Sequence, residues 1–217
     1  MHDPHAFVRA NTRLLPVPLV PEIALQLAEE SLPIWQRTEE ELGEMNVPPP
    51  YWAFAWAGGQ ALARFLLDHR PLVAGRRVLD LGAGSGLAAI AAMRAGAAAA
   101  LAADVDALAR AAIEINAAAN GVAVATTAAD LLAGPSAAAA ACELVLVGDL
   151  FYERALAERV VEFVAAARAR GAQVLVGDPQ RSYFPAGRFR ELACYRVPVT
   201  RELEDAEIKR TAVWQPA

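Results

Sequence analysis

A doubly wound α/β fold is predicted for this chain, because strand-like and helix-like segments alternate over residues 71–217 and a glycine-rich turn follows the first strand. Short apolar, strand-like runs occur at residues 78–81, 99–103, 122–127, 144–147 and 173–176. Helical periodicity separates them at residues 87–95, 106–119 and 153–170. Strands joined by helices pair in parallel through right-handed crossovers, so a mainly parallel sheet is expected.

Both ends of the chain depart from this alternation. Residues 192–199 and 209–214 carry β-type side chains with no helix between them, so we expect an antiparallel pair that closes one edge of a seven-stranded sheet. Toward the N-terminus, helices are expected over residues 21–30, 33–43 and 59–68, with a proline break at 48–50. No linker separates these parts. We expect one domain over 1–217, with a helical N-terminal extension at 1–70 and a core at 71–217.

Composition narrows the class of protein. With 217 residues, 56% hydrophobic and 21% charged, the chain can bury a substantial core. Charges interrupt every long apolar stretch, and the N-terminus lacks the pattern of a secretory signal, so no membrane association is expected. Cys142 and Cys194 are too few and too far apart for a metal motif or a disulfide framework. A net charge of −5 argues against nucleic acid, which needs clustered Lys and Arg. We expect a cytoplasmic protein without a bound metal.

The most informative segment is the turn that carries Gly82, Gly84 and Gly86, directly after a strand that contains Asp80. Glycines at a strand-to-helix turn permit tight backbone angles and let a ligand lie against bare backbone near helix amides. A dinucleotide fingerprint needs a third glycine where this chain has Leu87, and the lysine of a P-loop is missing from the sequence. An ordinary tight turn is the alternative. The pattern resembles motif I of class I S-adenosylmethionine-dependent methyltransferases, which have a Rossmann-like sheet.

This resemblance implies S-adenosylmethionine as the cofactor, with the turn beside its methionine portion and Asp80 helping to hold its amino end. Asp104 ends the second strand about 20 residues after the turn, where a carboxylate can accept both hydroxyls of a ribose. Its alternative role is a helix N-cap, which we assign to Asp106. Asp130 follows the third strand, where the family often places an acid or amide near the adenine. An exposed turn residue is the alternative reading of Asp130.

The fourth strand leads into Asp149 and Tyr152, which the fold would direct toward the transferred methyl group. Capping of the next helix by Asp149 and core packing of Tyr152 are the alternatives. Methyl transfer displaces an already activated sulfonium, so alignment matters more than acid catalysis. A lysine acceptor has an unperturbed pKa of about 10.4, which desolvation lowers and a carboxylate raises. Asp149 is therefore expected to orient the amine rather than to act as a strong base.

Segments outside the cofactor motifs are more specific. They lie at residues 7–12, 16–22, 49–60, 177–183 and 203–211. Together with the Asp-x-Phe-Tyr element that begins at Asp149, they resemble bacterial relatives of the electron-transfer-flavoprotein β-subunit lysine methyltransferases, in family 16 of the protein methyltransferases. The resemblance covers nearly the whole chain and implies the flavoprotein β-subunit as substrate, Asp149 and Tyr152 as catalytic residues, and Trp56 and Asp149 beside the cofactor. Trp56 as a core aromatic is the alternative.

Further readings stay open at this point. Six glutamates make the N-terminal segment acidic, which would steer a lysine-bearing surface toward the cleft, although a solvated helix face is the alternative. They are Glu29, Glu30, Glu39, Glu40, Glu41 and Glu44. The same fold also serves methyltransferases of ribosomal proteins and small molecules, and a cofactor-binding protein without turnover is a third reading. The target lysine, the degree of methylation and the oligomeric state are not determined by the sequence.

Overall fold

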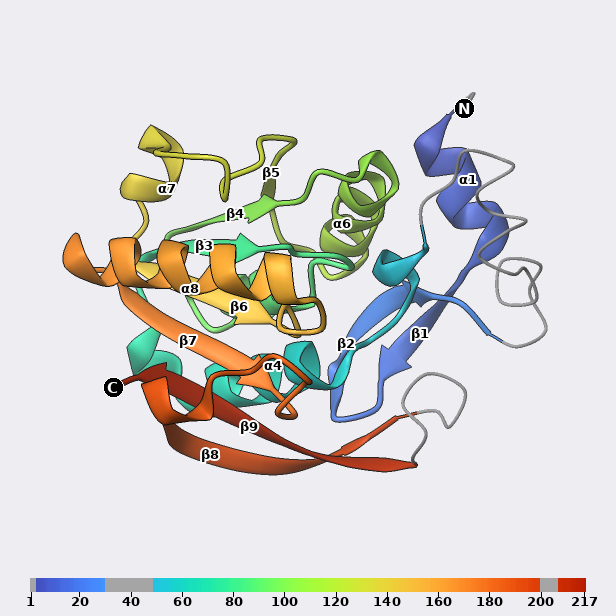
Figure 1. Ribbon diagram of the computed structural model, residues 1–217. Helices are drawn as coiled ribbons and strands as arrows, with labels where there is room; N and C mark the ends of the chain where they lie inside the picture. The colour runs from blue at the N-terminus through green and yellow to red at the C-terminus, as the bar shows by residue number, and fades with distance from the viewer. Residues whose placement is uncertain (1–2, 30–48, 200–206) are drawn as a thin grey trace.

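The computed structural model describes residues 3–29, 49–199 and 207–217. Its centre is a seven-stranded sheet, shown in Figure 1, whose strands lie in the order β5 (Ala125–Thr127), β4 (Ala99–Ala103), β3 (Arg77–Leu81), β6 (Leu144–Gly148), β7 (Gln173–Asp178), β9 (Ile208–Pro216) and β8 (Phe189–Pro198). The strands from β5 to β7 pair in parallel, β9 is antiparallel to β7, and β8 is antiparallel to β9. The predicted doubly wound sheet with an antiparallel edge is therefore confirmed.

Helices cover both faces of this sheet. They are α4 (Ala57–Asp68), α5 (Leu87–Arg94), α6 (Ala107–Ala119), α7 (Ala137–Ala140) and α8 (Arg154–Ala169), with short 3-10 turns η1 (Tyr51–Ala53), η2 (Arg70–Leu72) and η3 (Ala186–Arg188). In Figure 1, α8 crosses in front of the sheet and α4 lies behind it. Side chains alternate between the two layers, because successive strand residues face opposite sides. Val78 and Leu144 pack in the apolar cluster of α4 and α5, whereas Leu79 and Val145 pack in the cluster of α8.

Strand order reverses between β3 and β6, which are neighbours in space but are separated in sequence by β4 and β5. In doubly wound sheets, ligands bind at such a switch point, outside the carboxyl ends of the strands. Leu81, the last residue of β3, pairs with Val147 of β6. The glycine turn after β3 and the Asp149 loop after β6 therefore start from adjacent positions on the same edge.

The segment before α4 corrects one prediction. A helix was expected over residues 21–30, but β1 (Arg13–Val17) and β2 (Val20–Leu27) form an antiparallel hairpin there. Ile23, Leu25 and Leu27 are buried at alternate positions, which is the period of a strand, although the segment contains helix-forming Ala, Leu, Glu and Gln. The helix was predicted from the helix propensity of these residues, and the alternation of apolar residues was overlooked.

Contacts with α6 stabilise the extended conformation of β2. The side-chain oxygen of Asn120 accepts from the Ala24 amide at 3.1 Å, and that of Asn116 accepts from the Gln26 amide at 2.7 Å. Two polar side chains on a distant helix thus satisfy backbone donors of the hairpin. The N-terminal region is therefore only partly helical, with α1 (Pro4–Asn11) and α4 on either side of the hairpin. The helix predicted over 59–68 lies within α4, and the one predicted over 33–43 falls outside the described residues.

Candidate active site

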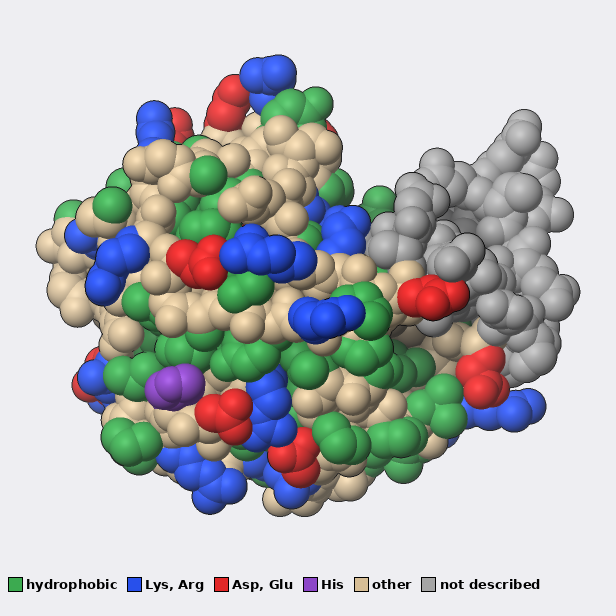
Figure 2. Space-filling model, turned by 90° about the horizontal axis from the view of Figure 1, so that it is seen from below, with side chains coloured by type: hydrophobic (Ala, Val, Ile, Leu, Met, Phe, Trp, Pro, Cys, Tyr) green, Lys and Arg blue, Asp and Glu red, His purple; other side chains and the backbone are tan. Residues whose placement is uncertain are grey.

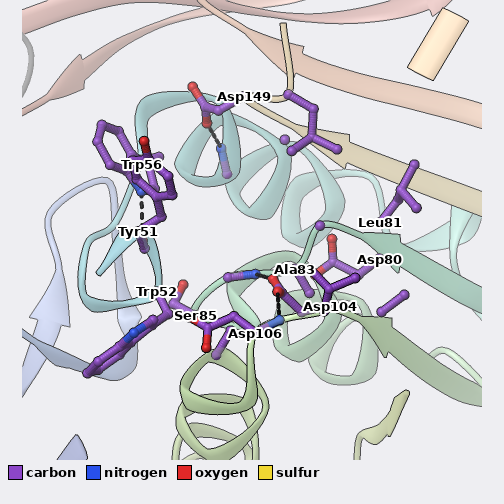
Figure 3. A pocket seen from close by; sticks show the side chains of 18 of the residues that line it. Tyr51, Trp52, Trp56, Asp80, Leu81, Ala83, Ser85, Asp104, Asp106 and Asp149 are labelled. Atoms are coloured by element: carbon purple, nitrogen blue, oxygen red, sulfur yellow. Dashed lines mark hydrogen bonds between the residues drawn. The ribbon is translucent and has the colours of Figure 1, made fainter. Parts of the chain in front are cut away.

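A cavity of about 580 Å³ opens at the carboxyl ends of β3, β4 and β6. Its volume lies within the range of small-molecule sites. The cavity is lined by the glycine turn, the ends of these strands, the η1 segment and the start of α4. Figure 3 shows Asp104 and Asp80 toward one end of this space and Trp56 with Asp149 toward the other. All eight predicted cofactor-binding residues belong to segments that meet here, and seven of them line the cavity directly: Trp56, Asp80, Gly82, Gly84, Asp104, Asp130 and Asp149.

The three glycines of the turn have positive φ values, but their surroundings differ. A Cβ on Gly82 would lie 2.8 Å from Leu150, and one on Gly86 would lie 3.0 Å from Ile113. Those two glycines are required by close packing as well as by backbone angle. At Gly84, with φ of 52°, the nearest atom would be 3.9 Å away. Gly84 therefore leaves bare backbone against open space in the cavity wall, whereas Gly86 lies behind the wall.

Asp104 ends β4 and stabilises the glycine turn. One carboxylate oxygen accepts from the Gly84 amide at 2.9 Å and the other from the Asp106 amide at 3.0 Å, as the dashed lines in Figure 3 show. Burial raises the pKa of Asp104, and these two backbone amides oppose the shift. Asp106 accepts from the Leu108 amide and is the N-cap of α6, as predicted. Each oxygen of Asp104 retains a lone pair for a further donor.

Asp80 lies deeper in the same wall. It is 3% exposed, and its side chain accepts from the Ala89 amide in α5 at 2.9 Å. Burial raises the pKa of Asp80 to about 7, and the nearby charge of Asp104 adds to the shift. A carboxyl group with this pKa can change protonation when a ligand arrives near neutral pH.

Asp130 lies at the outer rim. It accepts from the Leu132 amide at 3.0 Å and forms an ion pair with Arg159 of α8. The Arg159 hydrogen bond lowers the pKa of Asp130. Asp130 is largely exposed, as its alternative reading as a turn residue predicts, and it also lines the cavity. Its place near the adenine stays a prediction.

Asp149 occupies the opposite end of the cavity. The residue has φ of 59°, a left-handed conformation that Asp adopts more readily than most side chains. One carboxylate oxygen accepts from the Gly59 amide at 3.0 Å. The other accepts from Arg181, at 2.9 Å from Nε and 2.7 Å from Nη2. The N-cap of α8 is Glu153, so the alternative reading of Asp149 as the cap of that helix is wrong.

Two further glycines allow α4 to approach Asp149. A Cβ on Gly58 would lie 2.1 Å from the Gly177 carbonyl oxygen and 2.6 Å from the Asp149 carboxylate. A Cβ on Gly177 would meet the Gly58 carbonyl at the same distance of 2.1 Å. Backbone of α4 therefore contacts backbone of β7 directly. This contact brings the first amides of α4, where the positive end of the helix dipole lies, to the carboxylate.

Aromatic side chains surround this end of the cavity. The indole of Trp56 donates to the Tyr51 carbonyl at 2.8 Å, and the two rings meet edge to face at 6.0 Å. Tyr152 is 45% exposed, and its ring lies 5.7 Å from that of Tyr51. Burial on its inner side raises the pKa of Tyr152. Core packing was the alternative for Trp56 and Tyr152. The residues that pack in the core are instead their neighbours Trp52 and Phe151, which are fully buried.

Arg181 and Asp178 were not predicted from the sequence. Arg181 lines the cavity, and its guanidinium lies 5.5 Å from the centre of the Trp56 ring. Asp178, the last residue of β7, is fully buried and accepts from the Arg181 amide at 2.7 Å. Burial raises the pKa of Asp178 to about 7, with the charge of Asp149 as the next cause. The available signal was a Gly-Asp-Pro-x-Arg segment at the end of a strand, noted only as part of the resemblance.

Other kinds of site are not supported in the described part of the chain. His, Cys, Asp and Glu side chains nowhere gather there in threes that could hold a metal ion. In the described ranges, every helix is too short or too polar to span a bilayer.

Of the six N-terminal glutamates expected to steer a basic substrate, Glu29 forms an ion pair with Arg13, and the other five fall outside the described residues. On the face in Figure 2, basic and acidic side chains are interspersed among hydrophobic ones.

Known methyltransferases are similar to this chain in sequence and in fold. Residues 61–165 match the model of the family described as ribosomal protein L11 methyltransferase (PrmA). The fold is similar to the solved structure of magnesium protoporphyrin IX methyltransferase from Synechocystis PCC 6803, which contains bound S-adenosylmethionine. The TM-score is 0.52 at 15% identity, over 74% of this chain and 80% of that one. That likeness supports the fold.

Sequence similarity extends well beyond the cofactor motifs. The chain is 36% identical to the electron transfer flavoprotein beta subunit lysine methyltransferase of Danio rerio, over 96% of this chain and 81% of that protein. It is 37% identical to the protein of the same name from Xenopus laevis, over 97% of this chain and 86% of that protein. Identity at this level over nearly the full length shows that the chain belongs to the family of electron transfer flavoprotein beta subunit lysine methyltransferases.

Proposed function

We propose that this chain transfers a methyl group from S-adenosylmethionine to a lysine of the electron transfer flavoprotein beta subunit. The observation that carries the proposal is the similarity to relatives of that name, which spans 96–97% of the chain. Substrate specificity resides outside the cofactor motifs, because methyltransferases with other targets share those motifs. Similarity in the flanking segments therefore favours the same substrate.

The cavity fits the proposed cofactor. Gly84 offers bare backbone facing open space, and the two carboxylate oxygens of Asp104 have lone pairs for the ribose hydroxyls. In this proposal the carboxyl group of Asp80, in the same wall, binds the cationic amino group of the cofactor. Asp130, at the cavity rim, lies beside the adenine. When bound there, S-adenosylmethionine would supply the methyl group of its sulfonium, and the sulfur would become a neutral thioether. The residues of this chain would hold the cofactor and exclude water.

The acceptor side would be formed by Asp149, Trp56 and Tyr152. Asp149 is fixed at both oxygens and so presents a defined acceptor to a lysine amine. Aromatic faces attract ammonium groups, which suits the half-exposed rings of Tyr51 and Tyr152 at the cavity mouth. Both described cysteines are free thiols, which fits the cytoplasmic location that forms part of this proposal.

A labelling experiment tests the substrate. Purified protein is incubated with methyl-labelled S-adenosylmethionine and purified electron transfer flavoprotein, and both flavoprotein subunits are analysed by mass spectrometry. We expect mass increases of one or more methyl groups on a lysine of the beta subunit. Ribosomal protein L11 is the comparison substrate, because a family model for its methyltransferases matches residues 61–165. Methylation of L11 without methylation of the flavoprotein would refute the proposed substrate.

A further inference from the structure

Arg181 contacts the site from a segment remote in sequence from both the glycine turn and Asp149. Its side chain is only 15% exposed. Nε and Nη2 both donate to one oxygen of Asp149, and the guanidinium also lies over the Trp56 ring. Two donors on a rigid planar group restrict both the position and the rotation of the carboxylate. Arg181 therefore sets the orientation of Asp149.

The same pair changes the electrostatics of the acceptor site. A carboxylate alone would stabilise the protonated, non-nucleophilic form of a lysine and raise its pKa. A guanidinium at 2.7 Å from that carboxylate offsets its charge, as does the positive end of α4 that begins at the Gly59 amide. Asp149 can then accept a hydrogen bond from the amine without holding it as an ammonium ion.

The chemistry requires a neutral amine. The lysine first loses one proton to water, and its nitrogen lone pair then forms the new N–C bond while the C–S bond breaks and leaves its electron pair on sulfur. An ammonium group has no lone pair for this step. Near neutral pH a free lysine, with a pKa of about 10.4, is almost entirely protonated. A group that lowers the pKa of the bound lysine toward the working pH therefore raises the fraction of lysine that can react.

We propose that Arg181 is a positioning residue that fixes the Asp149 carboxylate and offsets its charge, so that the bound lysine loses its proton before methyl transfer. This inference rests on the proposed lysine methyltransferase function. Asp178 supports it by holding the backbone of the segment: its carboxylate accepts the Arg181 amide, next to Gln180 with φ of 64°. One oxygen of Asp178 is buried with no hydrogen-bond partner among the described residues, so the segment is held at an electrostatic cost.

Other titratable or charged groups line the cavity or lie beside the pair of Asp149 and Arg181. They are Tyr51, Asp80, Asp104, Asp106, Asp130, Tyr152, Arg159 and Asp178. The charge of Arg181 also lowers the pKa of Asp178, so the titration of Asp178 moves when Arg181 is substituted. A change in the pH dependence of the variant is therefore assigned to the bound lysine only where it persists in an Asp178→Asn background and a matched arginine substitution leaves the dependence unchanged.

The test is the pH dependence of the single-turnover rate with saturating flavoprotein, which reports the protonation of the bound lysine. For Arg181→Met we expect the ascending limb to move upward by about one pH unit. Arg181→Lys keeps the charge and should restore about half of that shift, because it lacks the planar pair of donors. Arg154→Met is the matched control: Arg154 is exposed and lies over the Tyr183 ring, and its loss should leave the limb in place.

A double substitution separates positioning from general structural damage. In an Asp149→Asn background, Arg181→Met should give a smaller shift, because the amine is no longer held against a carboxylate beside the guanidinium and only the direct repulsion between guanidinium and ammonium remains. Cofactor affinity, measured by calorimetry, should stay within about threefold of wild type in Arg181→Met. Equal loss of rate at every pH, or the same shift in the Asp149→Asn background, would overturn the inference.

The activity of the wild-type protein tells a failure of the proposed substrate apart from a failure of this inference. Failure of the wild type to methylate the flavoprotein overturns the proposed substrate, and the pH series is then run on ribosomal protein L11. A measurement on the protein alone is independent of both substrates: the carboxyl carbon-13 resonance of Asp149 should move in Arg181→Met and stay in Arg154→Met. An unmoved resonance in Arg181→Met would refute the contact on which the inference depends.

Discussion

The two ends of the cavity are built in different ways. At the cofactor end, Asp80, Gly84 and Asp104 lie within 25 residues, and backbone amides of the turn, of α5 and of the residue that caps α6 bind the two carboxylates. At the acceptor end, Trp56, Asp149 and Arg181 come from three segments that are separated by about 90 and about 30 residues. The first end depends on one continuous stretch of chain that runs from β3 through the glycine turn and α5 to the end of β4. The second exists only when α4, β6 and β7 are packed together.

This difference explains why the substrate of such an enzyme can change while its cofactor stays the same. A turn that binds through backbone and a few carboxylates suits a cofactor that many enzymes share. An end assembled from side chains on separate elements can change its substrate without loss of cofactor binding. The acceptor end also depends on Gly58 and Gly177, because their backbone contact places the start of α4 against the loop after β6. The following predictions test the division from the largest effect to the smallest.

Gly84→Asp should reduce the affinity for S-adenosylmethionine by at least about 100-fold, or about 3 kcal/mol, because a charged side chain would occupy the cavity beside Asp104. A Cβ at Gly84 would have its nearest neighbour 3.9 Å away, and Asp tolerates the left-handed backbone at this position (φ of 52°) better than most residues, so the fold should survive. Calorimetry measures the affinity. Gly121→Asp is the control, since Gly121 also has positive φ and open space but lies outside the cavity. Normal binding by Gly84→Asp would place the cofactor elsewhere.

Asp149→Ala should lower kcat by about 100-fold while the cofactor affinity changes less than about threefold. The reason is that Asp149 belongs to the acceptor end and its contacts are to Gly59 and Arg181. Steady-state rates on the flavoprotein and calorimetry on the same preparation separate the two quantities. Equal loss of rate and affinity would show that the two ends do not act independently.

Gly58→Ala should destabilise the protein by about 2–3 kcal/mol, because the new methyl group would collide with the Gly177 carbonyl and the Asp149 carboxylate. Chemical denaturation measures the free energy of unfolding. Gly187→Ala, in η3, is the matched control: a Cβ there meets no atom within 4 Å, and we expect a change below about 0.5 kcal/mol. Equal stability of the two variants would mean that α4 can shift without cost.

The pH dependence of cofactor binding should report Asp80, whose pKa in the unliganded protein is about 7. A cationic amino group prefers the ionised carboxylate, so below pH 7 binding must release a proton and the affinity falls. From pH 6 to 7.5 we expect a rise of up to about tenfold, a range in which an α-amino group of pKa about 7.7–8.0 stays largely protonated. In Asp80→Asn, calorimetry should find this dependence flattened. An unchanged slope would assign it to another group.

Most of the core fold followed from the sequence. The predicted strand at residues 99–103 coincides with β4, and helices α5, α6 and α8 end within one residue of their predicted limits. Prediction failed for the helix expected over residues 21–30, because helix-forming residues up to Leu27 belong to the strand β2. Asn116 on α6 and Asn120, the C-cap residue of that helix, lie about 90 residues away and bind the amides of that strand. Local propensity contributes less than such tertiary contacts.

By itself, the sequence determined the parallel sheet, the glycine turn and the acids that end the strands, because short-range periodicity and glycine spacing encode them. Only the tertiary structure decided how Asp149 is held. Its partners Gly59 and Arg181 lie 90 and 32 residues away in the chain. No local pattern specifies a guanidinium over the Trp56 ring or a helix backbone in contact with a strand backbone. Such contacts depend on the packing of whole elements, where distances in sequence have no fixed relation to distances in space.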